Sequence, residues 1–234
     1  MTGQSAPIRY YKGVPVPYIA AWSAEKEGNV VPEGFLLREN PFTGQSQLRY
    51  RDEHPADRDR HGILWHRVAW APGEGEPAFA EVHTVRQRRA LHRSLCQICG
   101  NPGVLWLTPA LLWDAHLADN GPRAPYRTSD PPVCRSCYEL ALRYCPELGR
   151  GKVILAPGRW AITAVRGQIA DPRRGGFSDP RTIDLPGMRG ADYPALSLVL
   201  AKGLVASLYH PRAVADPDAV TGLGVRVDPP PSTA

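Results

Sequence analysis

The chain has 234 residues with ordinary hydrophobic and charged fractions and a formal net charge of +5. This composition excludes fibrous and low-complexity proteins. No apolar run approaches the roughly 18 residues that a membrane helix needs, and the first residues lack the basic and apolar regions of a signal peptide. We therefore expect a cytoplasmic protein without a membrane anchor, in a compartment that keeps thiols reduced.

The positive charge comes mainly from arginine, since only four of the 28 basic residues are lysines. A surplus of arginine attracts polyanions such as nucleic acids. The same surplus also arises from the amino-acid usage of a GC-rich genome. The composition leaves both explanations open.

Residues 1–78 are predicted to be rich in β-structure, because short aromatic and β-branched segments alternate there with glycine and proline. The segments expected to be extended are Ile8–Tyr11, Val14–Trp22, Phe35–Arg38, Gln47–Arg51 and Ile63–Trp70. The third and fourth of these flank the sequence Asn40-Pro-Phe-Thr-Gly44, which favours a hairpin.

An uninterrupted helix is predicted for Phe79–Ser94, because Pro72–Pro77 ends the preceding region and no glycine or proline follows within the segment. Arg86, Arg89 and Arg93 recur at spacings of three and four, which places them on one helix face. Such a face is commonly the solvated side of a surface helix. The alternative is a strip that binds phosphate or acidic groups, and it makes these arginines candidate nucleic-acid contacts.

Two Cys-x-x-Cys pairs follow, Cys96 with Cys99 and Cys134 with Cys137. Four thiolates at about 2.3 Å complete the tetrahedral coordination of a zinc ion. Two redox dithiols are the competing explanation, but one metal explains two pairs at this spacing more simply. The sequence therefore predicts one structural Zn²⁺ ion with these four cysteines as ligands.

The surroundings of the two pairs predict different local structures. Gly100 follows the first pair and permits the positive φ of a tight turn, while the second pair begins a helix predicted for Val133–Cys145. A turn, an extended stretch and a helix that carries the second pair together resemble treble-clef zinc modules. The predicted module spans residues 79–150, and within it Pro109–Arg127 is expected to be an insertion.

Cys145 is the fifth cysteine, eleven residues after Cys134. Eleven residues span about 16 Å along a helix at about 1.5 Å per residue, so Cys145 is not expected to bind the same ion. It returns to nearly the same helix face as Cys134. We expect it to be a small buried hydrophobe rather than a reactive thiol.

The start of the module, Leu95-Cys-x-x-Cys-Gly100, also resembles zinc-bearing HNH nucleases. In that family an Asp-His pair after the first cysteine pair supplies the general base, and a histidine or asparagine near the second pair binds the catalytic metal. Here Asp114 and His116 are separated by one residue, and Tyr138 follows the second pair. The resemblance therefore implies the zinc frame and leaves His116 and Asp114 as displaced candidates for catalysis of metal-dependent cleavage.

The sequence after the module is predicted to add two strands, at Lys152–Leu155 and Trp160–Ile169. Arg173 and Arg174 follow in a basic loop, which is a second candidate contact for nucleic acid. Tyr193–Leu208 is almost continuously apolar and is predicted to be a buried helix.

The frame that runs from Cys96 to Pro146 and into a strand is similar to uncharacterised proteins of Streptomyces-type actinobacteria. That similarity covers most of the second half of the chain and implies no activity. It agrees with the surplus of arginine.

We therefore expect an α+β fold. It has a β-rich region 1–78, a treble-clef-like zinc module 79–150, strands and a C-terminal helix in 151–212 packed on that module, and a disordered tail 213–234. A closed site of four cysteines has no open position for a substrate, so the preferred function is a zinc-stabilised, non-catalytic protein that binds DNA or RNA. The alternatives are a protein-interaction or regulatory protein with structural zinc and a divergent HNH-type nuclease.

Overall fold

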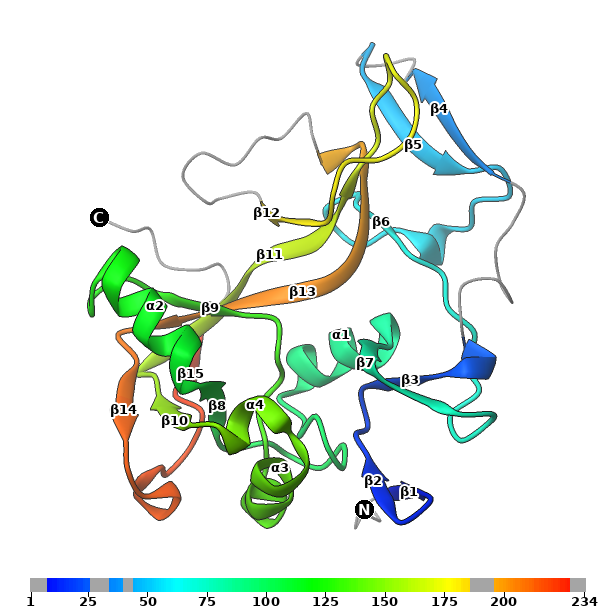
Figure 1. The fold of residues 1–234 in the computed structure, drawn as a ribbon. Coiled ribbons are helices and arrows are strands. Elements are labelled where there is room, and N and C mark those ends of the chain that lie inside the picture. The colour runs from blue at the N-terminus through cyan, green and yellow to red at the C-terminus, as the bar shows by residue number, and fades with distance from the viewer. Residues whose placement is uncertain (1–7, 26–33, 40–43, 186–195, 228–234) are drawn as a thin grey trace.

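A computed structural model describes residues 8–25, 34–39, 44–185 and 196–227 (Figure 1). The described chain is a mixed α/β structure in which strands predominate and helices are few. Its strands are β1 (Arg9–Tyr11), β2 (Val14–Val16), β3 (Ala20–Trp22), β4 (Phe35–Glu39), β5 (Ser46–Tyr50), β6 (Leu64–Trp65), β7 (Pro77–Val82), β8 (Trp106–Pro109), β9 (Tyr126–Thr128), β10 (Lys152–Ala156), β11 (Arg159–Ile169), β12 (Arg181–Asp184), β13 (Val199–Tyr209), β14 (Arg212–Val214) and β15 (Val225–Arg226). Its α-helices are α1 (Thr84–Arg93), α2 (Ala110–Asn120), α3 (Tyr138–Tyr144) and α4 (Pro146–Gly149), and its 3-10 helices are η1 (Ser23–Glu25), η3 (Pro55–Asp57), η4 (Arg135–Cys137) and η5 (Pro217–Ala219).

Two long antiparallel strands, β11 and β13, form the centre of the fold and run side by side (Figure 1). Pro157 follows β10 and Pro211 follows β13, and the pairing is interrupted between them because proline cannot donate a hydrogen bond to a ladder. Beyond the interruption the same two chain segments pair again as β10 and β14. The result is a two-stranded ribbon that passes from the larger sheet into the smaller one.

The larger sheet has the strand order β12–β11–β13–β6, with β9 also pairing with β13 and β15 with β11. β6 and β9 pair with different parts of β13 and leave a gap at Leu204. The side-chain amide of Gln87 on α1 fills this gap, accepting from the Leu204 N–H at 2.9 Å and donating to the Leu204 carbonyl at 2.9 Å. A helix side chain thus completes the edge of β13 and fixes α1 against the sheet.

The two largest hydrophobic cores of the described residues lie along the ribbon. The main core combines side chains of the larger sheet with Leu91 of α1 and Trp113 of α2. Trp106 and Trp160 are buried in it, as expected, with ring centroids 5.5 Å apart. The second core joins the smaller sheet, of order β14–β10–β8, to α3, α4 and the two cysteine pairs.

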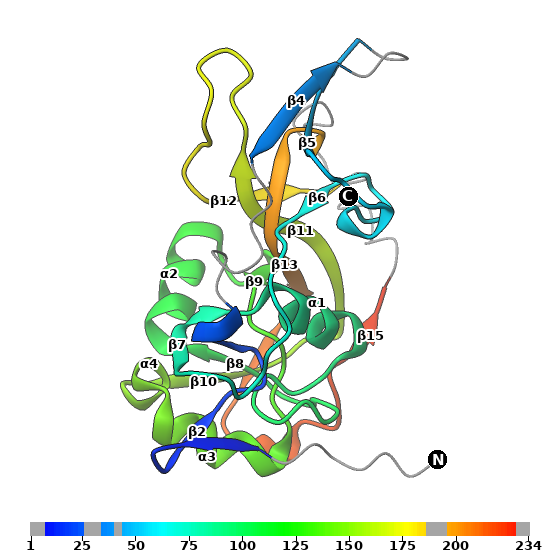
Figure 2. The same ribbon diagram turned by 90° about the vertical axis from the view of Figure 1, so that its right-hand side faces the viewer.

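The N-terminal third forms three small antiparallel pairs, β1 with β2, β3 with β7 and β4 with β5. The predicted hairpin between Phe35–Arg38 and Gln47–Arg51 is confirmed by the last of these. The β4–β5 hairpin lies at one end of the long ribbon, and the β1–β2 hairpin lies near α3 at the opposite end (Figure 2).

The predicted helices of the central region are confirmed in part. α1 begins only at Thr84, because Pro77–Val82 forms β7 and pairs with β3. The helix after the second cysteine pair is present as η4 and α3, but Val133 is extended and bridges to Leu105. None of the helices in the described residues is long and apolar enough to cross a membrane.

The predicted helix over Tyr193–Leu208 is wrong. Its first three residues lie outside the described residues, and Val199–Tyr209 forms β13 instead. All residues of β13 except Lys202 are buried. A central strand covered on both faces is continuously apolar, so periodicity cannot distinguish it from a buried helix.

The prediction of a disordered tail over 213–234 is also wrong for its first part. Residues 213–227 contain the end of β14, the 3-10 helix η5 and β15. β14 and β15 add to the edges of the two sheets, and this pairing outweighs the proline and aspartate content of the segment. Residues 228–234 lie outside the described residues.

Candidate metal centre

The first cysteine pair lies in a tight turn that begins at an antiparallel bridge between Leu95 and Pro102. The Cys96 N–H donates to the Asn101 carbonyl at 2.6 Å, and the Gly100 N–H donates to the Cys96 carbonyl at 2.9 Å. Gly100 has a φ of 75°, the left-handed conformation expected for it. This turn holds both thiols of the pair on the same side of the backbone.

The second pair lies at the start of the helical segment that continues into α3. Cys134 is extended and precedes η4, and the Cys137 N–H donates to the Cys134 carbonyl at 3.1 Å. Cys137 then precedes the first residue of α3. The two thiols are therefore presented from one short turn, as those of the first pair are.

The fold brings the two pairs together. The four Sγ atoms all lie within 4.8 Å of one another, and the Sγ atoms of Cys99 and Cys134 are 3.6 Å apart. Four sulfurs at about 2.3 Å from one tetrahedral ion lie about 3.8 Å apart. A disulfide requires about 2.05 Å, so these are free thiols arranged as a ligand set for one metal ion.

The electrostatic environment of the thiols favours a cation at their centre. Cys96, Cys99 and Cys137 are buried, and Cys134 is half-buried. Burial raises the pKa of the Cys96 thiol to about 12 and also raises the pKa of Cys137. Burial opposes ionisation of Cys99 too, but the Asn101 N–H and the neighbouring thiols lower its pKa. Four ionised thiols are therefore unfavourable here on their own, and a divalent ion would stabilise them.

Segments far apart in the sequence hold the centre in place. The Tyr18 N–H donates to the Ile98 carbonyl at 2.9 Å, which ties the N-terminal segment to the first cysteine turn. On the other side, Arg135 donates to the Pro217 carbonyl and the Asp218 carboxylate, each at 2.7 Å. The cysteine site therefore lies where three parts of the chain meet.

The described residues contain no other group of three or more cysteine, histidine and acidic side chains placed to share a metal ion. The four-cysteine group is closed, because four thiolates satisfy a tetrahedral ion and leave no position for water or substrate. Its chemical capacity is therefore to bind a metal and cross-link the chain.

Cys145 is free and does not belong to this group. It is half-buried and packs on the edge of the second core, where it also lines a groove beside α3. The expectation of full burial is therefore met only in part.

His116 and Asp114 lie on α2 and are not brought to the cysteines as ligands. The His116 ring stacks on Trp113 with centroids 5.5 Å apart, and it meets the Tyr126 ring edge-on at 5.2 Å. Asp114 is exposed to solvent. His116 therefore packs among aromatic rings and belongs to no group of three or more potential metal ligands in the described residues.

α1 carries four arginines, and the three of the predicted strip, Arg86, Arg89 and Arg93, do not share one exposed face. Arg89 and Arg93 are exposed, but Arg86 is buried and makes two hydrogen bonds to the Glu25 carboxylate, at 2.5 and 2.6 Å, and one to the Ala20 carbonyl at 2.7 Å. Sequence reasoning missed this ion pair. The available signal was that Arg86 lies one helical turn before Ala90, on the side of α1 that faces the core.

Arg173 and Arg174 lie in the loop that follows β11, as expected. Their backbone N–H groups both donate to the Asp171 carboxylate, at 2.8 and 3.0 Å, and their side chains are exposed. The Phe177 ring in this loop meets the Phe35 ring of β4 edge-on. The loop therefore lies beside the β4–β5 hairpin, at the end of β11 far from the cysteines (Figure 1).

Comparison with known proteins adds no family to these observations. No family model, no curated protein sequence and no solved structure matches the chain.

Proposed function

We propose that the four cysteines bind one structural zinc ion and that the chain is a non-catalytic binding protein built around this ion. The observation that carries the proposal is the approach of all four sulfurs to within 4.8 Å of one another in a largely buried site. Tetrahedral sites of four thiolates select zinc or iron among the common biological metals. Zinc is preferred because the site joins the first cysteine turn to the start of α3 and so cross-links the chain, which is the role of structural zinc.

The arrangement of elements supports a treble-clef-like module. A cysteine turn at Leu95–Pro102 is followed by β8 and then, after Cys137, by α3. α2 and β9 lie between these parts, in the stretch expected to be an insertion. The metal would then join the turn to the helix across the second core.

Nucleic acid is a candidate partner for such a binding protein. It is supported by the exposed side chains of Arg89 and Arg93 on α1 and by Arg173 and Arg174 in the loop after β11. Arg86 does not support it, because Glu25 already occupies its guanidinium group. Binding of this kind should weaken steeply as salt increases.

Metal content and thermal stability of matched variants test the zinc proposal. Cys137→Ser removes one of the four ligands, while Cys145→Ser removes the thiol outside the group. We expect elemental analysis to find one zinc ion per chain in the unaltered protein and in Cys145→Ser, and a lost or weakened ion in Cys137→Ser. Because binding energy at structural zinc sites is folding energy, Cys137→Ser should also unfold the second core.

Absence of metal from protein purified without chelators would refute the proposal. Equal metal loss in the two variants would refute the assignment of ligands. Iron in the protein, recognised by its thiolate-to-iron absorption, would support the four ligands and show that the metal is iron rather than zinc.

A further inference from the structure

A groove of about 480 Å³ lies beside the cysteine site. One wall is formed by Gln97 and Ile98, which lie between the two cysteines of the first pair. The opposite wall is formed by α3 and α4 from Leu140 to Leu148, directly after the second pair. Residues 14–20 and β7 complete it. Its volume lies in the range of about 300–1,000 Å³ that is typical of ligand sites.

The rim of the groove carries large apolar side chains that are not buried. The relative solvent exposure of the Phe79 and Val82 residues on β7 is 52% and 50%. That of Val14 on β2 and Tyr144 on α3 is 37% and 40%. Apolar surface that is continuous with a concave site marks a place where a second molecule binds. All four of these side chains line the groove itself, so a partner must bring apolar groups of its own, as the side chains of a polypeptide segment do.

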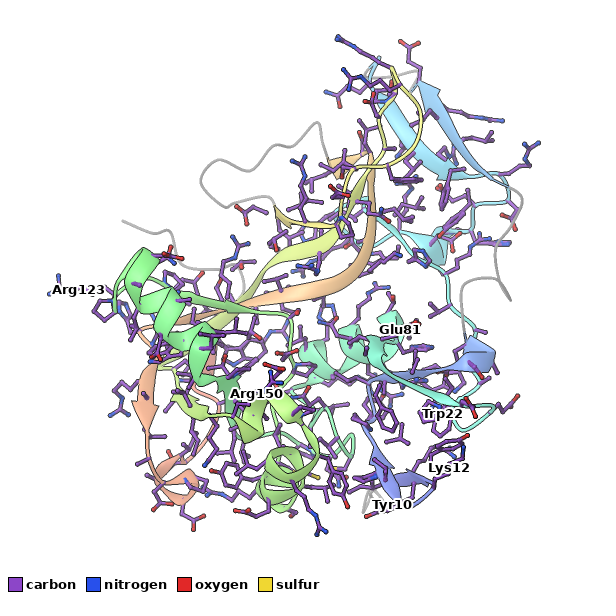
Figure 3. The ribbon with its side chains drawn as sticks, viewed as in Figure 1. Tyr10, Lys12, Trp22, Glu81, Arg123 and Arg150 are labelled. Carbon is purple, nitrogen blue, oxygen red and sulfur yellow. The ribbon has the colours of Figure 1, made fainter. Side chains whose placement is uncertain are left out.

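The charged side chains that line the groove in the described residues are both acidic, Glu81 and Asp130. Glu81 lies on β7 (Figure 3), across the groove from α3. The Asp130 carboxylate accepts no hydrogen bond and has no ion-pair partner among the described residues, although its backbone N–H donates to Thr128. Asp130 is exposed, so its carboxylate is open to a cationic group of a second molecule. The charged lining of the groove is therefore negative, although the chain as a whole has a net charge of +5.

We propose that the groove binds an extended, apolar segment of a partner polypeptide that presents a lysine or arginine side chain to Asp130, near the second negative charge that Glu81 adds to the lining. The proposal rests on the proposed function, since the cysteine turn and α3 that form two walls are the elements that zinc would join. Apolar side chains of the partner would pack against Phe79, Val82 and Tyr144. Phosphate groups of a nucleic acid would be repelled by the same two carboxylates.

A phage-displayed library of random dodecapeptides, selected on the zinc-loaded full chain, supplies the probe. The most enriched sequence is then made as a fluorescein-labelled peptide and titrated by fluorescence anisotropy. Phe79→Ser removes an apolar side chain of the rim, and Asp130→Asn removes the carboxylate with little change of shape. The matched controls are Leu111→Ser and Asp119→Asn, which change an exposed apolar and an exposed acidic residue of α2.

We expect enriched peptides that combine a basic residue with aromatic or aliphatic neighbours. Each groove variant should weaken binding about tenfold or more, and each control should stay within about twofold. Asp130→Asn should leave the melting temperature unchanged, because Asp130 is exposed and pairs with no charged group of the described residues. A structural role for Asp130 would lower the melting temperature instead.

Three results would overturn the proposal. The first is a failure to enrich any peptide, or the enrichment of acidic peptides. The second is binding that the groove variants leave unchanged. The third is a dimer in size-exclusion chromatography that Phe79→Ser dissociates, since the groove would then hold a second copy of this chain. Measuring zinc in the same preparations separates the two ideas. A chain purified without zinc would refute the zinc proposal, and peptide binding by that chain would still support the groove assignment.

Discussion

Replacing Arg86 with methionine would remove a charge and three hydrogen bonds while keeping most of the apolar part of the side chain. The fully buried Glu25 carboxylate would keep the N–H groups of Trp22, at 2.9 Å, and Ala71, at 3.1 Å, and the Nε2 atom of His83 would lie 3.6 Å away. Removing one partner of a buried ion pair costs about 3–5 kcal/mol, because the remaining charge stays buried without compensation. We expect Arg86→Met to lower the free energy of unfolding by about this amount.

Urea unfolding followed by tryptophan fluorescence measures this change. The control is the double variant Arg86→Met with Glu25→Leu, which removes both charges. It should recover most of the lost stability, because no buried charge is then left without a partner.

The pH dependence of stability gives a second readout of the same pair. Burial alone would raise the pKa of the Glu25 carboxyl, but the hydrogen bonds from Arg86 and Trp22 outweigh it and hold the pKa below its usual value. The carboxylate therefore stabilises the folded state above the unfolded-state pKa of about 4.3, and this contribution is lost as pH falls through the lower folded-state pKa. Arg86→Met removes the main opposing charge, so burial raises the folded-state pKa above the unfolded-state value, and the stability that the variant loses at neutral pH should be partly regained as pH falls and Glu25 is protonated.

A loss of less than about 1 kcal/mol, as for an exposed ion pair, together with unchanged acid sensitivity would refute the buried pair. Weaker nucleic-acid binding without any loss of stability would place the Arg86 guanidinium at the surface. Either result would restore the exposed arginine strip that the helix pattern of α1 predicts.

Three further predictions concern other parts of the fold. Removing the metal with a chelator should unfold the second core, and added zinc should restore it, with weaker binding at lower pH because the thiols must lose their protons; an unchanged melting temperature would contradict this. Gln87→Leu should cost about 1–3 kcal/mol in urea unfolding, because it leaves the Leu204 N–H and carbonyl without partners; a neutral effect would show that the edge of β13 is satisfied in another way. If α1 binds nucleic acid, Arg89→Gln with Arg93→Gln should flatten the salt dependence measured by mobility shift, and unchanged binding would exclude this surface.

The cysteine site is the part of the protein that local sequence describes best. Each Cys-x-x-Cys pair is a short turn whose geometry depends on nearby residues, such as Gly100 with its positive φ. In a chain with few cysteines, two such turns are best explained by one shared metal ion, and the four sulfurs do lie within 4.8 Å of one another. The strand at Trp160–Ile169 was predictable for a similar reason, since its β-branched and aromatic residues suit an extended backbone.

The main errors arose where long-range contacts decide between two locally acceptable structures. Val199–Tyr209 is rich in alanine and leucine and suits a helix, but pairing with β11 over its full length makes it a strand. Arg86 has the spacing of a surface arginine, and only the position of Glu25, 61 residues earlier, makes its burial favourable. Periodicity contains no information on either partner.

The sequence by itself determined the composition class, the two cysteine turns, the hairpin at β4 and β5 and the helix after Cys137, because each depends on residues that are close along the chain. Only the tertiary structure decided that the two turns meet, that Arg86 is buried and that β13 is a strand. The acidic, apolar groove also depends on the tertiary structure alone, because its walls come from residues 14–20, β7, the first cysteine turn and α3. Contacts between segments so far apart depend on how the chain as a whole buries its apolar surface, and this cannot be read from local patterns.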